Sequence, residues 1–188
     1  EHMSGILAKR GYEFTDDESQ ADVIIINSCC FINDAKEESI NTIFEMAEYK
    51  KVGRCKALVL AGCLAQRYHK EIKEEIPEID ICIGTTAIDS IAEAIEEFLN
   101  KNQKVEILRS IDLVAGIDAP RNLSTPGSYA YLKIAEGCDK HCTYCIIPKI
   151  RGNYRSVKME TLLKEAEELA ERGIKELILV AQETTMYG

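Results

Sequence analysis

The chain has 188 residues, with 23 Lys and Arg against 32 Asp and Glu, so its net charge is −9 at neutral pH. This balance argues against a strong, sequence-independent nucleic-acid binder, because such binding depends on clustered positive charge. No apolar run approaches the length of a membrane span, so we expect no membrane contact. Hydrophobic residues make up 46% of the chain, enough for the core of one large domain or two small ones.

Eight cysteines occur in the chain, and no secretory signal is visible. Cysteines in a reducing compartment serve metal binding or catalysis more often than disulfides, so we expect a cytoplasmic protein that binds metal. The residues Glu1-His2-Met3 run directly into a helical pattern, and Met186-Tyr187-Gly188 directly follows a strand pattern. We therefore expect this chain to be part of a longer protein.

Strand and helix patterns alternate over the first 110 residues. Runs of β-branched and other apolar residues predict buried strands at residues 22–27, 56–61, 79–83 and 105–108. Helical periodicity predicts intervening helices around residues 3–10, 33–47, 71–76 and 88–99. The apolar stripe of the last of these is predicted to be Ile88, Ile91, Ile95 and Leu99. Asn33 or Asp34 is placed to cap the second helix. Its predicted buried stripe is Ile40, Ile43, Phe44 and Ala47. The alternation predicts a small parallel α/β domain over residues 1–110.

Two of these predicted strands end in cysteine. The first leads into Cys29 and Cys30, and the second leads into Cys63. The carboxyl ends of parallel strands meet at one edge of a sheet, so we expect Cys29 and Cys63 to lie at the same rim. Cys82 lies inside the third strand and is expected to be a small buried hydrophobe. Cys55 has no partner at ligand spacing and is expected to be a bystander.

Composition changes after residue 110. Residues 111–127 hold two of the four prolines together with several Gly, Ser and Thr residues, which predicts a linker. The remaining residues, 128–188, predict a strand at 128–135, a helix at 159–172 and a strand at 176–181. The predicted apolar side of that helix is Leu162, Leu163, Ala166, Leu169 and Ala170. Gln182–Thr185 directly follows the carboxyl end of the last strand.

Between the first strand and the helix lies a loop with Cys138, Cys142 and Cys145 in C-x₃-C-x₂-C spacing. Three thiolates are one short of a closed zinc site. They are also one short of the set that occupies every iron of a [4Fe–4S] cluster, and would leave one iron open. Two other interpretations stay open on spacing alone. One is a zinc-dependent nucleic-acid-binding module that recruits His141 or a distant cysteine. The other is a scaffold domain with incidental cysteines.

The loop and its flanks resemble the radical SAM enzymes, which carry C-x₃-C-x-Φ-C with Φ usually aromatic. Tyr144 occupies the Φ position, and Gly137, Ile147-Pro148 and Arg151-Gly152 resemble the methylthiotransferase family in particular. The resemblance implies a [4Fe–4S] cluster on Cys138, Cys142 and Cys145 that binds S-adenosylmethionine, with Tyr144 at the cofactor. It further implies that residues 128–188 are the first β-α-β unit of a (β/α) barrel.

The resemblance returns in the N-terminal part of the chain. The segments Asn27–Ile32 (N-S-C-C-F-I) and Gly62–Arg67 (G-C-L-A-Q-R) are similar to the family's auxiliary-cluster patterns. They imply that Cys29 and Cys63 bind a second [4Fe–4S] cluster, whereas Cys30 falls where the family often has glycine. The family's third auxiliary cysteine belongs to a segment before the first helix that these residues lack.

Two segments, 34–40 and 131–139, look more like the branch that modifies the β-carbon of an aspartate in a small-subunit ribosomal protein. The alternative is the branch that modifies transfer RNA adenosine. The first branch implies a ribosomal protein or the small ribosomal subunit as partner and a reducing electron-transfer protein. Nucleic acid would be bound, if at all, by a module outside this chain.

Overall fold

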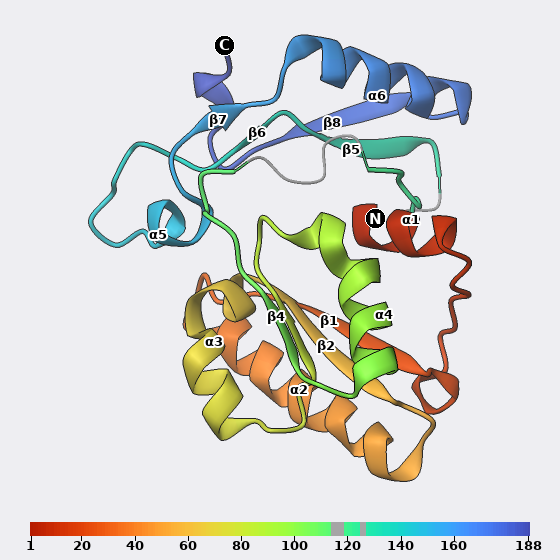
Figure 1. Cartoon of the computed structure of the whole chain (residues 1–188). Helices are drawn as coiled ribbons and strands as arrows, with labels where there is room; N and C mark the ends of the chain where they lie inside the picture. Colours follow the sequence, from red (N-terminus) through yellow and green to blue (C-terminus); the bar gives the residue numbers. More distant parts are fainter. Residues whose placement is uncertain (114–118, 125–126) are drawn as a thin grey trace.

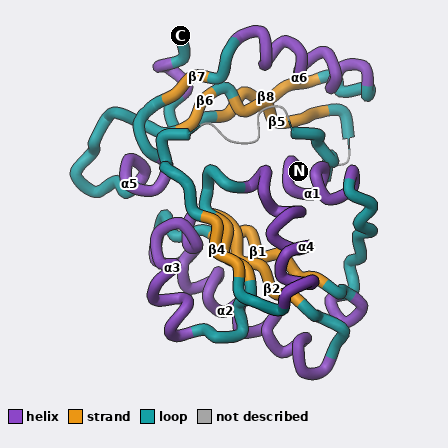
Figure 2. Tube along the Cα trace, in the orientation of Figure 1, coloured by secondary structure: helices purple, strands orange, loops and turns teal. Residues whose placement is uncertain are grey.

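The computed structural model describes residues 1–113, 119–124 and 127–188, and it contains two α/β units joined by the segment after β4 (Figure 1). The first unit is a four-stranded sheet with helices on both faces. The second is a two-stranded sheet covered by one long helix (Figure 2). In the part of the chain that is described, no helix is both long and apolar enough to cross a membrane.

The first sheet is entirely parallel, with strand order β1-β2-β3-β4. Its strands are β1 (Val23–Ser28), β2 (Ala57–Gly62), β3 (Ile81–Ile83) and β4 (Val105–Ile107). β1 pairs with β2 over its whole length, from Val23 opposite Ala57 to Ser28 opposite Gly62. The predicted parallel α/β fold of this part of the chain is therefore confirmed.

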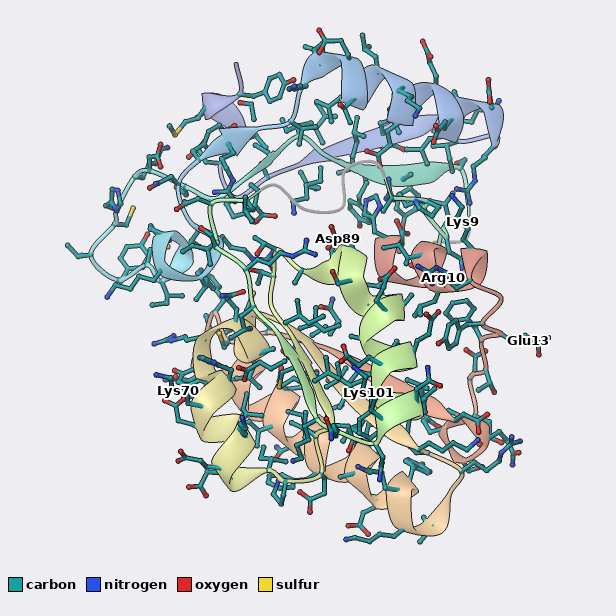
Figure 3. All side chains as sticks on the ribbon, in the orientation of Figure 1. Lys9, Arg10, Glu13, Lys70, Asp89 and Lys101 are labelled. Carbon is teal, nitrogen blue, oxygen red and sulfur yellow. The ribbon has the colours of Figure 1, made fainter. Side chains whose placement is uncertain are left out.

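Two pairs of helices cover the two faces of this sheet (Figure 1). α2 (Asn33–Val52) and α3 (Cys63–Glu75) pack on one face, and α1 (His2–Lys9) and α4 (Ile91–Lys101) pack on the other. Short 3₁₀ turns at Glu18–Gln20 and Ile88–Ser90 precede β1 and α4. β2 is buried at every position because both helical layers cover it. Arg10 at the end of α1 reaches α4, where its guanidinium donates to Glu96 at 3.0 Å (Figure 3).

The start of α2 differs from the prediction. Its N-cap residue is Ile32, and neither Asn33 nor Asp34 caps the helix, because both lie within its first turn. Asp34 at that position can still interact favourably with the positive helix end.

Four residues of the predicted apolar stripes are exposed. Phe44, Leu99 and Leu163 are 51%, 43% and 56% exposed, and Ala170 is exposed as well. α2 and α4 turn a slightly different face inward than the hydrophobicity pattern predicts. α2 buries Ser39 in line with Ile43 and Ala47, and α4 buries Phe98 in place of Leu99.

The second unit contains the predicted β-α-β arrangement. β5 (Tyr129–Lys133) pairs in parallel with β8 (Glu176–Val180), and α6 (Met159–Glu171) connects them. The predicted strand at 128–135 is divided, because its last part forms β6 (Ala135–Glu136), which pairs antiparallel with β7 (Arg155–Ser156). α5 (Ile147–Arg151) lies between β6 and β7, and a 3₁₀ turn at Thr184–Met186 follows β8.

Residues 119–121 lie between α1 and the second unit. A Cβ atom added at Gly5 of α1 would come within 2.0 Å of the Pro120 carbonyl oxygen, so helix and segment are in close contact. The Arg121 side chain donates from Nε to Glu1 at 2.8 Å and from Nη1 to Glu165 of α6 at 2.7 Å. All three side chains are less than one-fifth exposed, so this network joins the two units where water is largely excluded.

Asp80 forms a buried ion pair at the start of β3. Its carboxylate, 8% exposed, accepts from Lys50 Nζ at 2.7 Å and from the Leu58 amide at 2.8 Å. Replacing Asp80 by Ala leaves the Leu58 amide unpaired and leaves Lys50 with only the Glu78 carbonyl as partner, so we expect the free energy of unfolding to fall by about 3 kcal/mol. Urea denaturation measures this change. The control, Glu48→Ala, removes an exposed ion pair with Lys51 and should cost less than about 1 kcal/mol.

Candidate functional site

The rim at the carboxyl ends of β1 and β2 carries two of the predicted metal-binding cysteines. Ser28 and Gly62 are opposite each other in the sheet, and Cys29 and Cys63 follow them directly. The structure therefore brings these two cysteines to the same edge, as expected from the strand pattern. Gly62 has φ of +98°, and a Cβ atom there would lie 2.7 Å from the Ser28 carbonyl oxygen. Glycine thus allows the close approach of the two strand ends.

The two rim cysteines differ in exposure. Cys29 is exposed, whereas Cys63 is 5% exposed and is the first residue of α3. The backbone of Cys29 is held by Ser39 of α2, whose Oγ accepts from the Cys29 amide at 3.0 Å. Cys30 is 3% exposed, and burial, with a contribution from the nearby Cys63, raises the pKa of its thiol.

A hollow of about 360 Å³ runs along the outer edge of β1 and opens beside Cys29. It is lined by Ile24–Asn27 and Cys29 on the strand side. On the α2 side it is lined by Ala35, Glu38, Ser39, Thr42 and Met46. The rim next to Cys29 is therefore accessible from this side.

Two other cysteines, Cys82 and Cys55, are buried and are not predicted to bind metal. Cys82 is 7% exposed inside β3, and burial raises the pKa of its thiol to about 11. Cys55 is 6% exposed, and burial raises its thiol pKa as well. Both behave as small buried hydrophobes.

The loop with Cys138, Cys142 and Cys145 lies between β6 and α5, and protrudes from the second unit toward the first (Figure 2). Backbone hydrogen bonds close its base, with the Cys138 amide donating to the Gly152 carbonyl at 3.2 Å. Within the loop the Cys145 amide donates to the Cys142 carbonyl at 2.9 Å. Cys142 is exposed, the other two cysteines are half-buried, and Tyr144 is 90% exposed.

Across residues 1–113, 119–124 and 127–188, no three His, Cys, Asp or Glu side chains converge closely enough to form a metal site. The chemistry of the donor set nevertheless fits an iron–sulfur cluster. Three soft thiolate donors lie on one short loop, and each of them is reachable from solvent. Cys138, Cys142, Cys145, Cys29 and Cys63 therefore remain predicted ligands, and Tyr144 remains a predicted cofactor-binding residue.

The segment that follows β8, which contains Gln182 and Glu183, contacts the cysteine loop. Gln182 Oε1 accepts from the Gly137 amide at 2.8 Å, directly before the first loop cysteine. Glu183 forms an ion pair with Lys140, inside the loop. The ammonium group of Lys140, with hydrogen bonds from Thr185, lowers the pKa of Glu183 to about 2.

α5 connects the cysteine loop to the first unit. Ile150 is 1% exposed and packs in the same core as Cys30, Cys63 and Leu64. Arg151, the last residue of α5, donates from Nη2 to Cys63 Sγ at 3.1 Å. The structure thus brings the segment that follows one predicted cluster loop into contact with a cysteine of the other predicted site.

Sequence reasoning did not assign roles to Ser39 or Arg151. Ser39 carries a weak signal, since it lies four residues before Ile43 and therefore on the buried face of α2. In the sequence, Arg151 stands out only as part of the Arg151-Gly152 pair that resembles the methylthiotransferases. Its contact with Cys63 joins residues 88 positions apart, and no local spacing indicates it.

Comparison with known proteins identifies the class. Residues 1–84 match the family model described as "Uncharacterized protein family UPF0004", and residues 132–188 match the radical SAM superfamily. The cysteine rim lies in the first match and the cysteine loop in the second. The chain therefore combines a UPF0004 region with the first part of a radical SAM region.

Individual relatives are more specific. The chain is 58% identical over all 188 residues to "Ribosomal protein uS12 methylthiotransferase RimO" of Lachnoclostridium phytofermentans. It is 53% and 54% identical to proteins of the same name from Clostridioides difficile and Pelotomaculum thermopropionicum. The chain is therefore similar to the RimO members of the radical SAM methylthiotransferases. It spans 42% of the length of these relatives.

Gly137 is the residue on which the geometry of the loop base most depends. Its φ is +81°, and a Cβ atom would lie 2.2 Å from the Asn153 carbonyl oxygen. We expect Gly137→Ala to lower the free energy of unfolding by about 3 kcal/mol, measured by chemical denaturation. Gly173 is a matched control, with φ of +91° and open space around it. Gly173→Ala should cost about 1 kcal/mol, and equal losses in both variants would contradict the steric argument.

The Glu183–Lys140 ion pair predicts a pH dependence. The pKa of Glu183 in the folded chain is about 2, below its ordinary value of 4.5. The stabilisation is therefore present above pH 4.5 and is lost as the pH falls through about 2. An NMR titration of the Glu183 carboxyl carbon should show this midpoint. In Lys140→Ala the midpoint should move up toward 4.5, and an unchanged midpoint would rule out Lys140 as the main cause.

Proposed function

We propose that the full-length protein is a radical SAM methylthiotransferase that adds a methylthio group to the β-carbon of an aspartate in ribosomal protein uS12. The observation that carries this proposal is the unbroken similarity of all 188 residues to RimO proteins. Those relatives are named as methylthiotransferases of ribosomal protein uS12, which gives the proposed substrate. The matched region includes both cysteine sites, so five of the proposed cluster ligands lie in this chain.

Cys138, Cys142 and Cys145 would hold a [4Fe–4S] cluster that binds S-adenosylmethionine, with Tyr144 beside the cofactor. When bound, this cofactor supplies a carbon-centred radical able to remove hydrogen from an unactivated C–H bond. The protein's own part is to position the loop. Gln182 fixes the amide of Gly137 at 2.8 Å, and the Cys138 amide is bonded to the opposite side of the loop base.

Cys29 and Cys63 would hold an auxiliary [4Fe–4S] cluster, the second of two, near the source of the inserted sulfur. The adjacent ends of β1 and β2 support this assignment, since they bring both residues to one rim. A further ligand would come from a segment outside these residues. We propose residues 1–110 as the auxiliary-cluster domain, 111–127 as the linker and 128–188 as the start of the radical SAM domain. Residues 114–118 and 125–126 of that linker lie outside the described residues.

The proposed setting follows from the substrate. The partners would be ribosomal protein uS12 or the small ribosomal subunit and a reducing electron-transfer protein, in the cytoplasm. The ribosomal-protein branch is favoured over the transfer-RNA branch, because the relatives named above are uS12 methylthiotransferases. The match to the radical SAM superfamily likewise favours an iron–sulfur cluster over the zinc-module and scaffold interpretations.

Anaerobic reconstitution with iron and sulfide tests the proposal. The full-length protein is reduced, and its electron paramagnetic resonance spectrum is recorded with and without S-adenosylmethionine. Two overlapping signals, one of them changed by S-adenosylmethionine, are expected. Mass spectrometry of a uS12 peptide after turnover should then show the methylthio group on aspartate. Stoichiometric zinc without a cluster would overturn the proposal.

Cys142 is exposed and lies in the middle of the loop, so its replacement should remove a ligand without disturbing the core. We expect Cys142→Ala in the full-length enzyme to abolish formation of 5′-deoxyadenosine, quantified by liquid chromatography. Cys82→Ala is the control, because Cys82 is buried in β3 and touches neither predicted site. That variant should retain activity within about threefold, since it removes one small apolar group. Undiminished 5′-deoxyadenosine in Cys142→Ala would refute the ligand assignment.

A further inference from the structure

The side chain of Arg151 contacts both cysteine-bearing parts of the molecule. Nη2 lies 3.1 Å from Cys63 Sγ at the start of α3, and Nη1 lies 3.5 Å from Glu136 Oε1 in β6. β6 leads directly into the cysteine loop, and α5 leads directly out of it. The guanidinium group of Arg151 therefore links the segments on both sides of the cysteine loop to Cys63, at the start of α3.

The partners of Arg151 differ in kind from those of Arg121, which also joins the two units. Elsewhere in the described chain, Arg121 joins the same two units through carboxylates, at 2.8 Å to Glu1 and 2.7 Å to Glu165. Arg151 instead directs its shorter contact at a sulfur atom and its longer one at a carboxylate. Its side chain is 27% exposed, so solvent screens the contact only in part.

We propose that Arg151 is a positioning residue that holds the Cys63 sulfur toward the radical SAM loop and tunes the auxiliary cluster bound there. The inference rests on the proposed function, because it takes Cys63 as a cluster ligand. Arg151 would donate an N–H···S hydrogen bond from outside the ligand set, and Glu136 would keep the guanidinium in place. It would not touch the substrate.

Two consequences follow from this geometry. Hydrogen bonds and positive charge at cluster sulfurs favour the more negative, reduced state, so loss of Arg151 should lower the reduction potential of the auxiliary cluster. Partners outside the ligand set also orient the ligands, and their loss typically reduces activity about 10- to 100-fold. The loss should fall on methylthio transfer. Formation of 5′-deoxyadenosine needs only the loop cluster and should remain within about threefold of wild type.

The experiment uses the full-length enzyme, a uS12 peptide and the variants Arg151→Met and Arg151→Lys. Arg155→Met is the matched control. Arg155, in β7, is 15% exposed against 27% for Arg151, and it contacts Asp112 and the backbone carbonyls of Arg151 and Asn153 but neither Cys63 nor Glu136. The potential of the auxiliary cluster is measured by an electron paramagnetic resonance redox titration. A Cys138→Ala/Cys142→Ala/Cys145→Ala background leaves only that cluster to be observed.

We expect Arg151→Met to lower the potential and to reduce the ratio of methylthio product to 5′-deoxyadenosine at least tenfold. Arg151→Lys should recover part of both, since it keeps the charge and one donor, and Arg155→Met should change neither. Circular dichroism verifies folding, and if the Met variant does not fold, the same two readouts on Arg151→Lys and Arg151→Gln decide. Unchanged potential and ratio in the folded variants would overturn the inference.

The same experiment separates this inference from the proposed function. If the wild-type enzyme forms no methylthio product on uS12, the proposed function fails whatever the variants do. If the wild type is active while the Arg151 variants match it, only the role of Arg151 fails. If the wild type assembles no auxiliary cluster in the triple-alanine background, the role assigned to Arg151 at Cys63 is overturned as well.

Discussion

The rest of the structure depends on the register between β1 and β2. Because Ser28 pairs with Gly62 at the last position of the ladder, both chains leave the sheet at the same level. Cys29 and Cys63 are thereby placed at one rim by backbone hydrogen bonds. A shift of one residue in this register would turn every side chain of β1 to the opposite face of the sheet. The two helical layers oppose such a shift, since both faces of the sheet are packed against them.

The second unit is held to this rim at two places. The Arg121 network lies at α1 and α6, and the α5 contact lies at the cysteine-bearing end of the sheet. Two separated contacts restrict rotation of one unit against the other more than either contact alone. Ile150 contributes apolar burial, and Arg151 contributes a polar contact with a defined direction. The cysteine loop, between β6 and α5, is thus positioned by its flanks rather than by its own packing.

Much of the fold was predictable because it is encoded locally. Runs of β-branched residues indicated the parallel strands, and helical spacing indicated α1, α4 and α6. The errors are also physical in origin. Phe44 and Leu163 fit the helical periodicity, but the width of the buried face depends on what packs against it, and here both side chains remain outside. The short pairing of β6 with β7 was not predicted, because strands of two residues have almost no hydrophobic pattern.

The sequence by itself determined where the candidate metal ligands lie along the chain. The spacing of Cys138, Cys142 and Cys145 restricts the metal groups that three thiolates on one loop can hold, and spacing is a property of the chain. Only the tertiary structure determined which residues far apart in the sequence come into contact at these sites. Cys63 and Arg151 are 88 positions apart, and their 3.1 Å contact exists because α5 packs on α3. Packing between distant segments depends on the shapes of both surfaces, and neither segment encodes that fit alone.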